Sequence, residues 1–130
     1  MRRLVLLAVA TAALALPALA AAHPLGNFTI NRFSRIEAPG PRLYVRYVLD
    51  MAEIPTFQAR QAGIDGTAYA HRIASNTRLT VDGKPARLVV HGHALAFPHG
   101  AGGLQTTRLE VILGGPRLAG PARVRYVDTN

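Results

Sequence analysis

Ten consecutive residues, Arg42–Met51, alternate between apolar and more polar side chains. Because neighbouring side chains of a β-strand point to opposite faces, this pattern predicts a strand with one buried face. Such a strand needs a sheet that is covered on one side, so the segment restricts the fold more than any other part of the sequence. The side chains expected to be buried are Leu43, Val45, Tyr47, Leu49 and Met51.

A weaker strand is predicted before it, over residues 27–37. Its apolar side chains change step midway, and a β-bulge near residues 31–32 would reconcile the two halves. Pro-Gly-Pro at residues 39–41 predicts a turn. We therefore expect the two strands to pair as an antiparallel hairpin.

Two short helices are expected next. Thr56 is placed to cap a helix over residues 57–61, and Gly63 would end it. Side chains spaced three and four apart predict a second helix over residues 65–75. Together these segments would form a helical insert between strands.

The rest of the chain is predicted to be β-structure. Asp82-Gly83 favours a tight hairpin, and Gly114-Gly115-Pro116 favours a turn. Six strands with a helical insert indicate a mainly β fold, an antiparallel β-sandwich of Ig-like type. Its C-terminal edge is expected to be open, as in a domain truncated from a longer chain. The four later strands are predicted over residues 79–81, 86–97, 106–113 and 122–127.

The first 22 residues have the pattern of a signal peptide, expected to be helical. Arg2 and Arg3 precede an apolar run over residues 4–16, and small residues follow Pro17. Cleavage is predicted after Ala20 or Ala22, which leaves residues 23–130 as one exported domain in the periplasm or at the cell surface. No later apolar run approaches the roughly 20 residues that a membrane helix needs, so membrane association is expected through a partner.

Composition narrows the possible functions. The chain has no cysteine, which excludes disulfides and cysteine-based metal or redox sites. Its net charge is +8, but the arginines are scattered along the sequence, whereas nucleic-acid binding needs a clustered basic face. No nucleophile elbow, phosphate loop or zinc-protease motif is present. We therefore expect a domain that is not an enzyme and does not bind nucleic acid.

His23 is the first candidate metal ligand. If cleavage follows Ala20, the amine, two backbone amides and the imidazole of His23 make a square-planar nitrogen set that suits Cu(II) and Ni(II). If cleavage follows Ala22, His23 offers its own amine and a ring nitrogen, and a second histidine must complete the site. The alternative is that His23 merely follows the cleavage site.

His91 and His93 are the second candidate pair. On a strand, residues two apart point to the same side and lie about 6.5–7 Å apart, which lets two imidazoles reach one ion. The alternative is that both are structural histidines, because Val89, Leu95 and Phe97 would share their face.

Asp50 and Glu53 lie three residues apart where the predicted strand ends. They could present carboxylates beside the segment that follows His23. The alternative is that they pair with nearby arginines and cap the turn.

Two stretches resemble a known family. His23-Pro24-Leu25-Gly26-Asn27-Phe28-Thr29-Ile30-Asn31 is similar to the opening of the extracytoplasmic N-terminal domain of bacterial nickel/cobalt transporter-like proteins of the NicO type, also described as high-affinity nickel transporters. Residues 47–58, which include Asp50, Glu53 and Pro55, resemble the second signature of that domain. Residues 102–104, 108–110 and 126–130 fit its later strands.

The resemblance implies an exported β-rich domain that accompanies a polytopic membrane domain moving Ni(II) or Co(II). That membrane domain is absent from this sequence, so none of its ligands can be assigned here. We expect a non-enzymatic accessory domain whose partner is a membrane transporter, and which binds Ni(II), Co(II) or Cu(II) through His23. The alternative is a structural domain that docks on the transporter and binds no metal.

Overall fold

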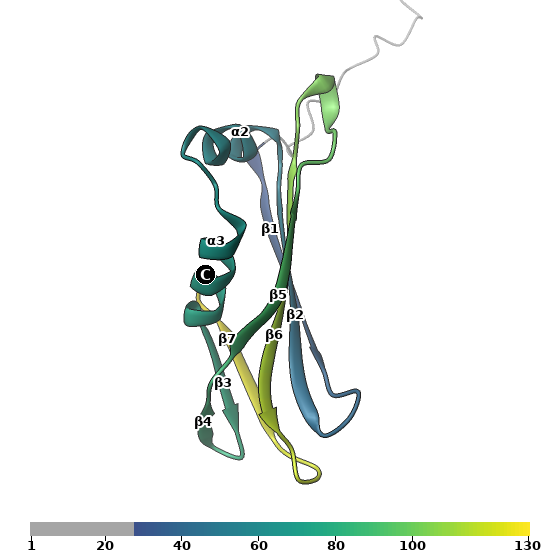
Figure 1. The fold of residues 1–130 in the computed structure, drawn as a ribbon, viewed down its shortest axis with the longest axis vertical. Coiled ribbons are helices and arrows are strands. Elements are labelled where there is room, and N and C mark those ends of the chain that lie inside the picture. The colour runs from purple at the N-terminus through teal and green to yellow at the C-terminus, as the bar shows by residue number, and fades with distance from the viewer. Residues whose placement is uncertain (1–27) are drawn as a thin grey trace, which may run out of the picture.

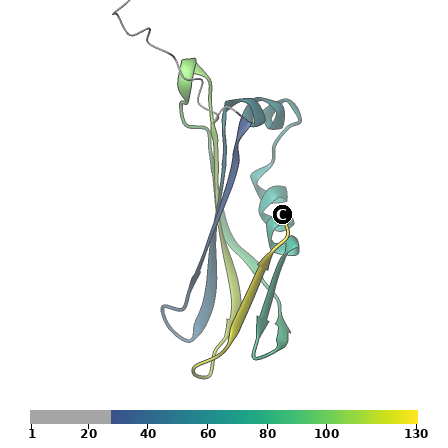
Figure 2. The same ribbon diagram turned by 180° about the vertical axis from the view of Figure 1, so that it is seen from behind.

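A computed structural model describes residues 28–130 of the chain. The described strands form two antiparallel sheets packed face to face, which confirms the β-sandwich (Figures 1 and 2). The larger sheet has the order β1 (Ile30–Glu37), β2 (Arg42–Met51), β6 (Thr107–Arg117) and β5 (Val89–Ala96). The smaller sheet has the order β4 (Lys84–Ala86), β3 (Thr77–Val81) and β7 (Val124–Asp128).

Two helices complete the sandwich. Helix α3 (Gly66–Asn76) and the small sheet cover the same face of the large sheet, and α2 (Glu53–Gln61) crosses one end of it (Figure 1). The Asp65 carboxylate fixes the start of α3 by accepting hydrogen bonds from the backbone N–H groups of Thr67 at 2.7 Å and Ala68 at 3.3 Å. These two donors have no partner within the helix, so the cap satisfies them.

The core lies between the two layers, on the face predicted from the alternation in β2. Leu43, Val45, Tyr47, Leu49 and Met51 are all at most 3% exposed. Apolar side chains of β6 continue this face, and Ile73 of α3 and Leu79 of β3 close it from the other layer. The alternation in β2 therefore identified both the strand and its buried side.

The outer face of the large sheet carries a chain of ion pairs. Arg46 lies between Glu37 and Glu110, at 3.7 Å and 3.9 Å, and Arg108 lies between Glu110 and Asp50, at 2.9 Å and 3.1 Å. All five side chains are at least one third exposed, so each pair contributes little on its own. Together the pairs give each charged side chain of this network an opposite charge beside it, which allows this face of the sheet to stay polar and exposed.

Several predicted boundaries are wrong. Helix α2 begins at Glu53, so Thr56 lies inside it, and the Thr56 hydroxyl donates to the Met51 carbonyl at 3.1 Å instead of capping the helix. The turn predicted at residues 114–116 is part of β6. The strand predicted over residues 86–97 divides into β4 and β5, which belong to different sheets, and this gives seven described strands instead of six.

The predicted bulge in β1 is also wrong. Strand β1 pairs with β2 without interruption from Ile30 opposite Met51 to Glu37 opposite Tyr44. The change of step in its apolar residues arises because β1 is an edge strand with apolar side chains on both faces. Register shifts occur elsewhere in the large sheet, between Val90 and Gly92 in the pairing of β5 with β6 and between Arg42 and Tyr44 in the pairing of β2 with β6.

Thr107 presents a buried hydroxyl without a hydrogen-bond partner among the described residues. Its side chain is 1% exposed, so water cannot replace the missing partner at this position. We expect Thr107→Val to raise the free energy of unfolding by about 1 kcal/mol, because valine keeps the shape and removes the unpaired group. Urea denaturation measures this, with Thr80→Val on β3 as the control, because the Thr80 hydroxyl has a partner, the Arg125 carbonyl at 3.4 Å. A loss of stability in Thr107→Val would contradict the prediction.

Candidate functional site

A cleft lies where α2 meets the loop between β5 and β6. It has a volume of about 630 Å³. The two exposed apolar side chains at this cleft are Phe57 on α2, 60% exposed, and Leu104 on the loop, 50% exposed. An apolar cleft with a few polar groups is the usual form of a binding site. Its lining consists of Glu53, Thr56, Phe57, Arg60, Gln61, His99, Gly103, Leu104 and Gln105.

Glu53 joins the two walls of this cleft. Its Oε1 accepts a hydrogen bond from the Ala101 backbone N–H at 2.9 Å, and the residue is only 9% exposed. The same hydrogen bond, followed by one from the Glu53 backbone N–H, lowers the pKa of this carboxyl. A Cβ at Gly100 would lie 2.5 Å from Glu53 Oε1 and 2.9 Å from Thr106 Cγ2, so glycine leaves room for the carboxylate to approach the loop. Glu53 is therefore a positioning residue for the loop.

Arg60 supplies positive charge to the cleft. Its guanidinium lies 4.8 Å from the centre of the Phe97 ring and donates a hydrogen bond to Gln105 Oε1. Within residues 28–130 it forms no ion pair with a carboxylate. The cleft thus combines an apolar rim with a cation that has no acidic partner, which suits a segment carrying an apolar side chain next to a carbonyl or carboxylate.

The two candidate carboxylates do not converge. Asp50 lies on the outer face of the sheet, where both of its oxygens accept from Arg108 Nη1, at 3.2 Å and 3.1 Å. Glu53 points into the cleft instead. The reading in which Asp50 pairs with a nearby arginine is confirmed, whereas Glu53 binds a loop amide. Pro55 is buried in the first turn of α2, where the absence of an N–H does no harm.

His91 and His93 contact opposite faces of the large sheet, so the expectation that they share a face is wrong. The register shift between Val90 and Gly92 breaks the alternation. The His91 ring packs edge-on to Tyr44 at 5.6 Å on the outer face. The Nε2 atom of His93 lies 3.5 Å from Thr67 Oγ1 of α3 on the inner side. The two imidazoles are not brought together.

Within residues 28–130, no three histidine or acidic side chains gather closely enough to hold one metal ion. His23, together with Pro24, Leu25, Gly26 and Asn27, lies outside the described residues, as does the predicted signal peptide. The role of His23 as a metal ligand and the signal peptide therefore remain predictions. His99 lines the cleft and pairs with Gln105 in an isolated antiparallel β-bridge.

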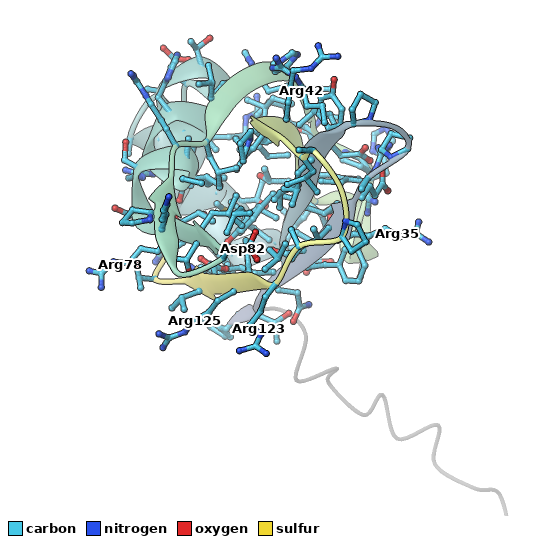
Figure 3. All side chains as sticks on the ribbon, turned by 90° about the horizontal axis from the view of Figure 1, so that it is seen from below. Arg35, Arg42, Arg78, Asp82, Arg123 and Arg125 are labelled. Carbon is cyan, nitrogen blue, oxygen red and sulfur yellow. The ribbon has the colours of Figure 1, made fainter. Side chains whose placement is uncertain are left out.

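The arginines are spread around the molecule. Seen from the end that carries the turns, Arg35, Arg42 and Arg78 project on different sides, and Arg123 and Arg125 lie together at the margin (Figure 3). This agrees with their scatter along the sequence. The positive charge at the cleft therefore comes from Arg60 itself.

Replacing Glu53 is expected to release the Ala101–Gly103 turn. Because the pKa of Glu53 is lowered in the folded protein, its contribution is present above the ordinary glutamate value of about 4.3 and is lost as pH falls through the lower folded value. We expect the Ala101 amide proton to shift upfield in Glu53→Ala at every pH, and in the unaltered protein only on acidification. Glu53→Gln, which keeps an acceptor oxygen, should shift less. An unchanged Ala101 resonance in Glu53→Ala would overturn this role.

None of the described helices is long and apolar enough to cross a membrane. Comparison with known proteins found no matching family model, no similar curated protein and no similar solved structure.

Proposed function

We propose that this chain is an exported, non-enzymatic accessory domain of a nickel/cobalt-type cation transport system, and that it docks on a membrane transporter through the cleft between α2 and the β5–β6 loop. The transport context comes from the sequence resemblance. The observation that supports the docking surface is that Glu53, Thr56 and Phe57, all within the second stretch of that resemblance, line this cleft.

The chemistry of the cleft favours a protein segment as its occupant. Phe57 and Leu104 give an apolar rim, and Arg60 offers unused hydrogen-bond donors beside it. An extracytoplasmic loop of a transporter carries both apolar side chains and backbone carbonyls. Exposed aromatic and arginine side chains are also the residues that most often dominate protein–protein binding.

Photocrosslinking in the cell that makes the protein tests this docking. We expect a photoreactive phenylalanine at Phe57 or Leu104 to form an adduct with a polytopic membrane protein, and Arg60→Ala to reduce its yield. The control position is Val89 on β5, which is 51% exposed and distant from the cleft in the fold. Equal adducts from Val89, or an adduct with a protein outside cation transport, would contradict the proposal.

The metal-binding form of the proposal rests on His23. Titration calorimetry of the exported protein with Ni(II) and with Cu(II) tests it, alongside His23→Ala and the paired His91→Ala, His93→Ala variant. Binding tighter than about 1 µM that is lost only in His23→Ala would support a metal-carrying accessory domain. Weaker binding would contradict the metal-carrying form and would favour the alternative, a domain that docks on the transporter and binds no metal.

A further inference from the structure

We propose that β1 is a self-association edge: two copies of this chain pair antiparallel through β1, about a two-fold axis at Phe33, and join their four-stranded sheets into one. This inference concerns a different surface from the cleft and goes beyond the proposed function.

The backbone of β1 is ready to accept another strand. Strand β1 stands at one edge of the large sheet and runs its length (Figure 2). The Ala52 N–H donates to the Thr29 carbonyl at 2.9 Å. In an antiparallel pair every second residue bonds to the neighbouring strand, so the backbone N–H and C=O groups of the odd-numbered residues of β1 point to β2. The N–H and C=O groups of the even-numbered residues, from Ile30 to Ile36, therefore point to the open side. The strand contains no proline and no bulge.

Three large apolar side chains are exposed along this edge. Phe33 is 58% exposed on the outer face, and Ile30 and Ile36 are each 43% exposed on the inner face. The small sheet contacts β1 between them, where Ser34 Oγ and the Tyr126 hydroxyl are 2.6 Å apart. Apolar side chains on both faces of an unpaired edge are unusual, since edges are normally protected from pairing.

The spacing of these side chains identifies the partner. Ile30, Phe33 and Ile36 are symmetric about Phe33, each isoleucine three residues from it. A two-fold interface must be self-complementary, because each surface patch meets its own copy. A palindromic apolar pattern meets that requirement, whereas pairing with an unrelated strand does not need one. We therefore assign the edge to a second copy of this chain.

One register satisfies the whole strand. Placing Phe33 opposite the partner's Phe33 sets Ile30 opposite the partner's Ile36. Phe33 then occupies a non-hydrogen-bonded pair, in which opposing side chains approach most closely. Arg32 faces the partner's Ser34 and Arg35 faces the partner's Asn31, so no arginine opposes an arginine. Arg35 already projects away from the molecule (Figure 3), with 67% of its side chain exposed.

Sedimentation of the exported protein tests the association. We expect twice the monomer mass at about 0.1 mM, because one strand pair is a small interface of low affinity. Phe33→Lys should return the protein to monomer, since two lysines would face one another. Phe57→Lys is the matched control, as Phe57 is 60% exposed on α2, and should leave the dimer intact. A monomer at this concentration, or a dimer that survives Phe33→Lys, would overturn the proposal.

Single cysteines test the register, because the chain has none of its own. Oxidation should crosslink Phe33→Cys to dimer. Arg35→Cys should stay monomeric, since the two introduced residues would be offset by four positions, roughly 13 Å along the strand. Both variants are folded if their circular dichroism matches that of the unaltered protein. Crosslinking of Arg35→Cys without Phe33→Cys would reject the assigned pairing.

Discussion

Leu109→Ala is expected to lower the free energy of unfolding by about 3 kcal/mol, because it removes a fully buried side chain from the centre of the core. Leu109 lies in β6 between two neighbouring strands, opposite Leu49 of β2 and Leu95 of β5. Strands on both sides are held by hydrogen bonds and cannot move inward to fill the space. The cost should therefore exceed the transfer energy of the lost methyl groups.

Urea denaturation followed by circular dichroism measures this loss. Leu104→Ala makes the same substitution at a side chain that is 50% exposed, and we expect it to cost less than about 1 kcal/mol. Similar losses in the two variants would show that the inner face of β6 is not the centre of the core.

Tyr47→Phe is expected to cost about 2 kcal/mol at neutral pH, because it removes a hydrogen bond to a charged acceptor that links the two sheets. The Tyr47 ring is fully buried, and its hydroxyl donates to Asp128 Oδ2 of β7 at 3.0 Å. Burial, together with this hydrogen bond, raises the pKa of Tyr47, so the hydroxyl stays protonated at neutral pH.

The cost of Tyr47→Phe should shrink in acid. Burial on its own would raise the pKa of Asp128, but hydrogen bonds from the Asn130 backbone and side chain and from Tyr47 outweigh it and lower that pKa. The stability from this carboxylate is therefore present above the ordinary aspartate value of about 3.9 and is lost as pH falls through the lower folded value. Denaturation of both proteins between pH 7 and pH 2.5 measures the difference. A cost independent of pH would contradict a link through the charged carboxylate.

The sequence predicts the central strands well because they are long and covered on one side only. The alternation in Arg42–Met51 leaves one arrangement of buried side chains, and the structure has the strand with those bounds. The helix predicted over residues 65–75 is present as α3, and the Asp65 carboxylate just before it accepts two backbone hydrogen bonds at its start. In both cases, local chemistry and the packed fold require the same conformation.

The errors arise where packing overrides local signals. Gly114, Gly115 and Pro116 favour a turn locally, yet the adjacent strands hold Gly114 in β6 opposite Tyr44 and Val89. Residues 86–97 have the composition of one strand, and nothing in their pattern shows that residues 87–88 carry the chain from one sheet to the other.

The cleft could be anticipated only in part. The position of Glu53 at a strand end makes it a candidate from the sequence, but its role depends on the Ala101 N–H, 48 residues away. Phe57 and Leu104 are apolar residues that a sequence pattern assigns to a core, and only the fold shows that they are exposed.

The irregular pairing in β5 has a consequence for how many copies can assemble. The register shift between Val90 and Gly92 twists this strand and disturbs its row of donors and acceptors, so the far side of the large sheet is a poor template for another strand. Within the large sheet, an edge that can be extended at β1 but not at β5 would take on one neighbour. The proposed association through β1 would therefore close as a pair of large sheets and would not extend this sheet further.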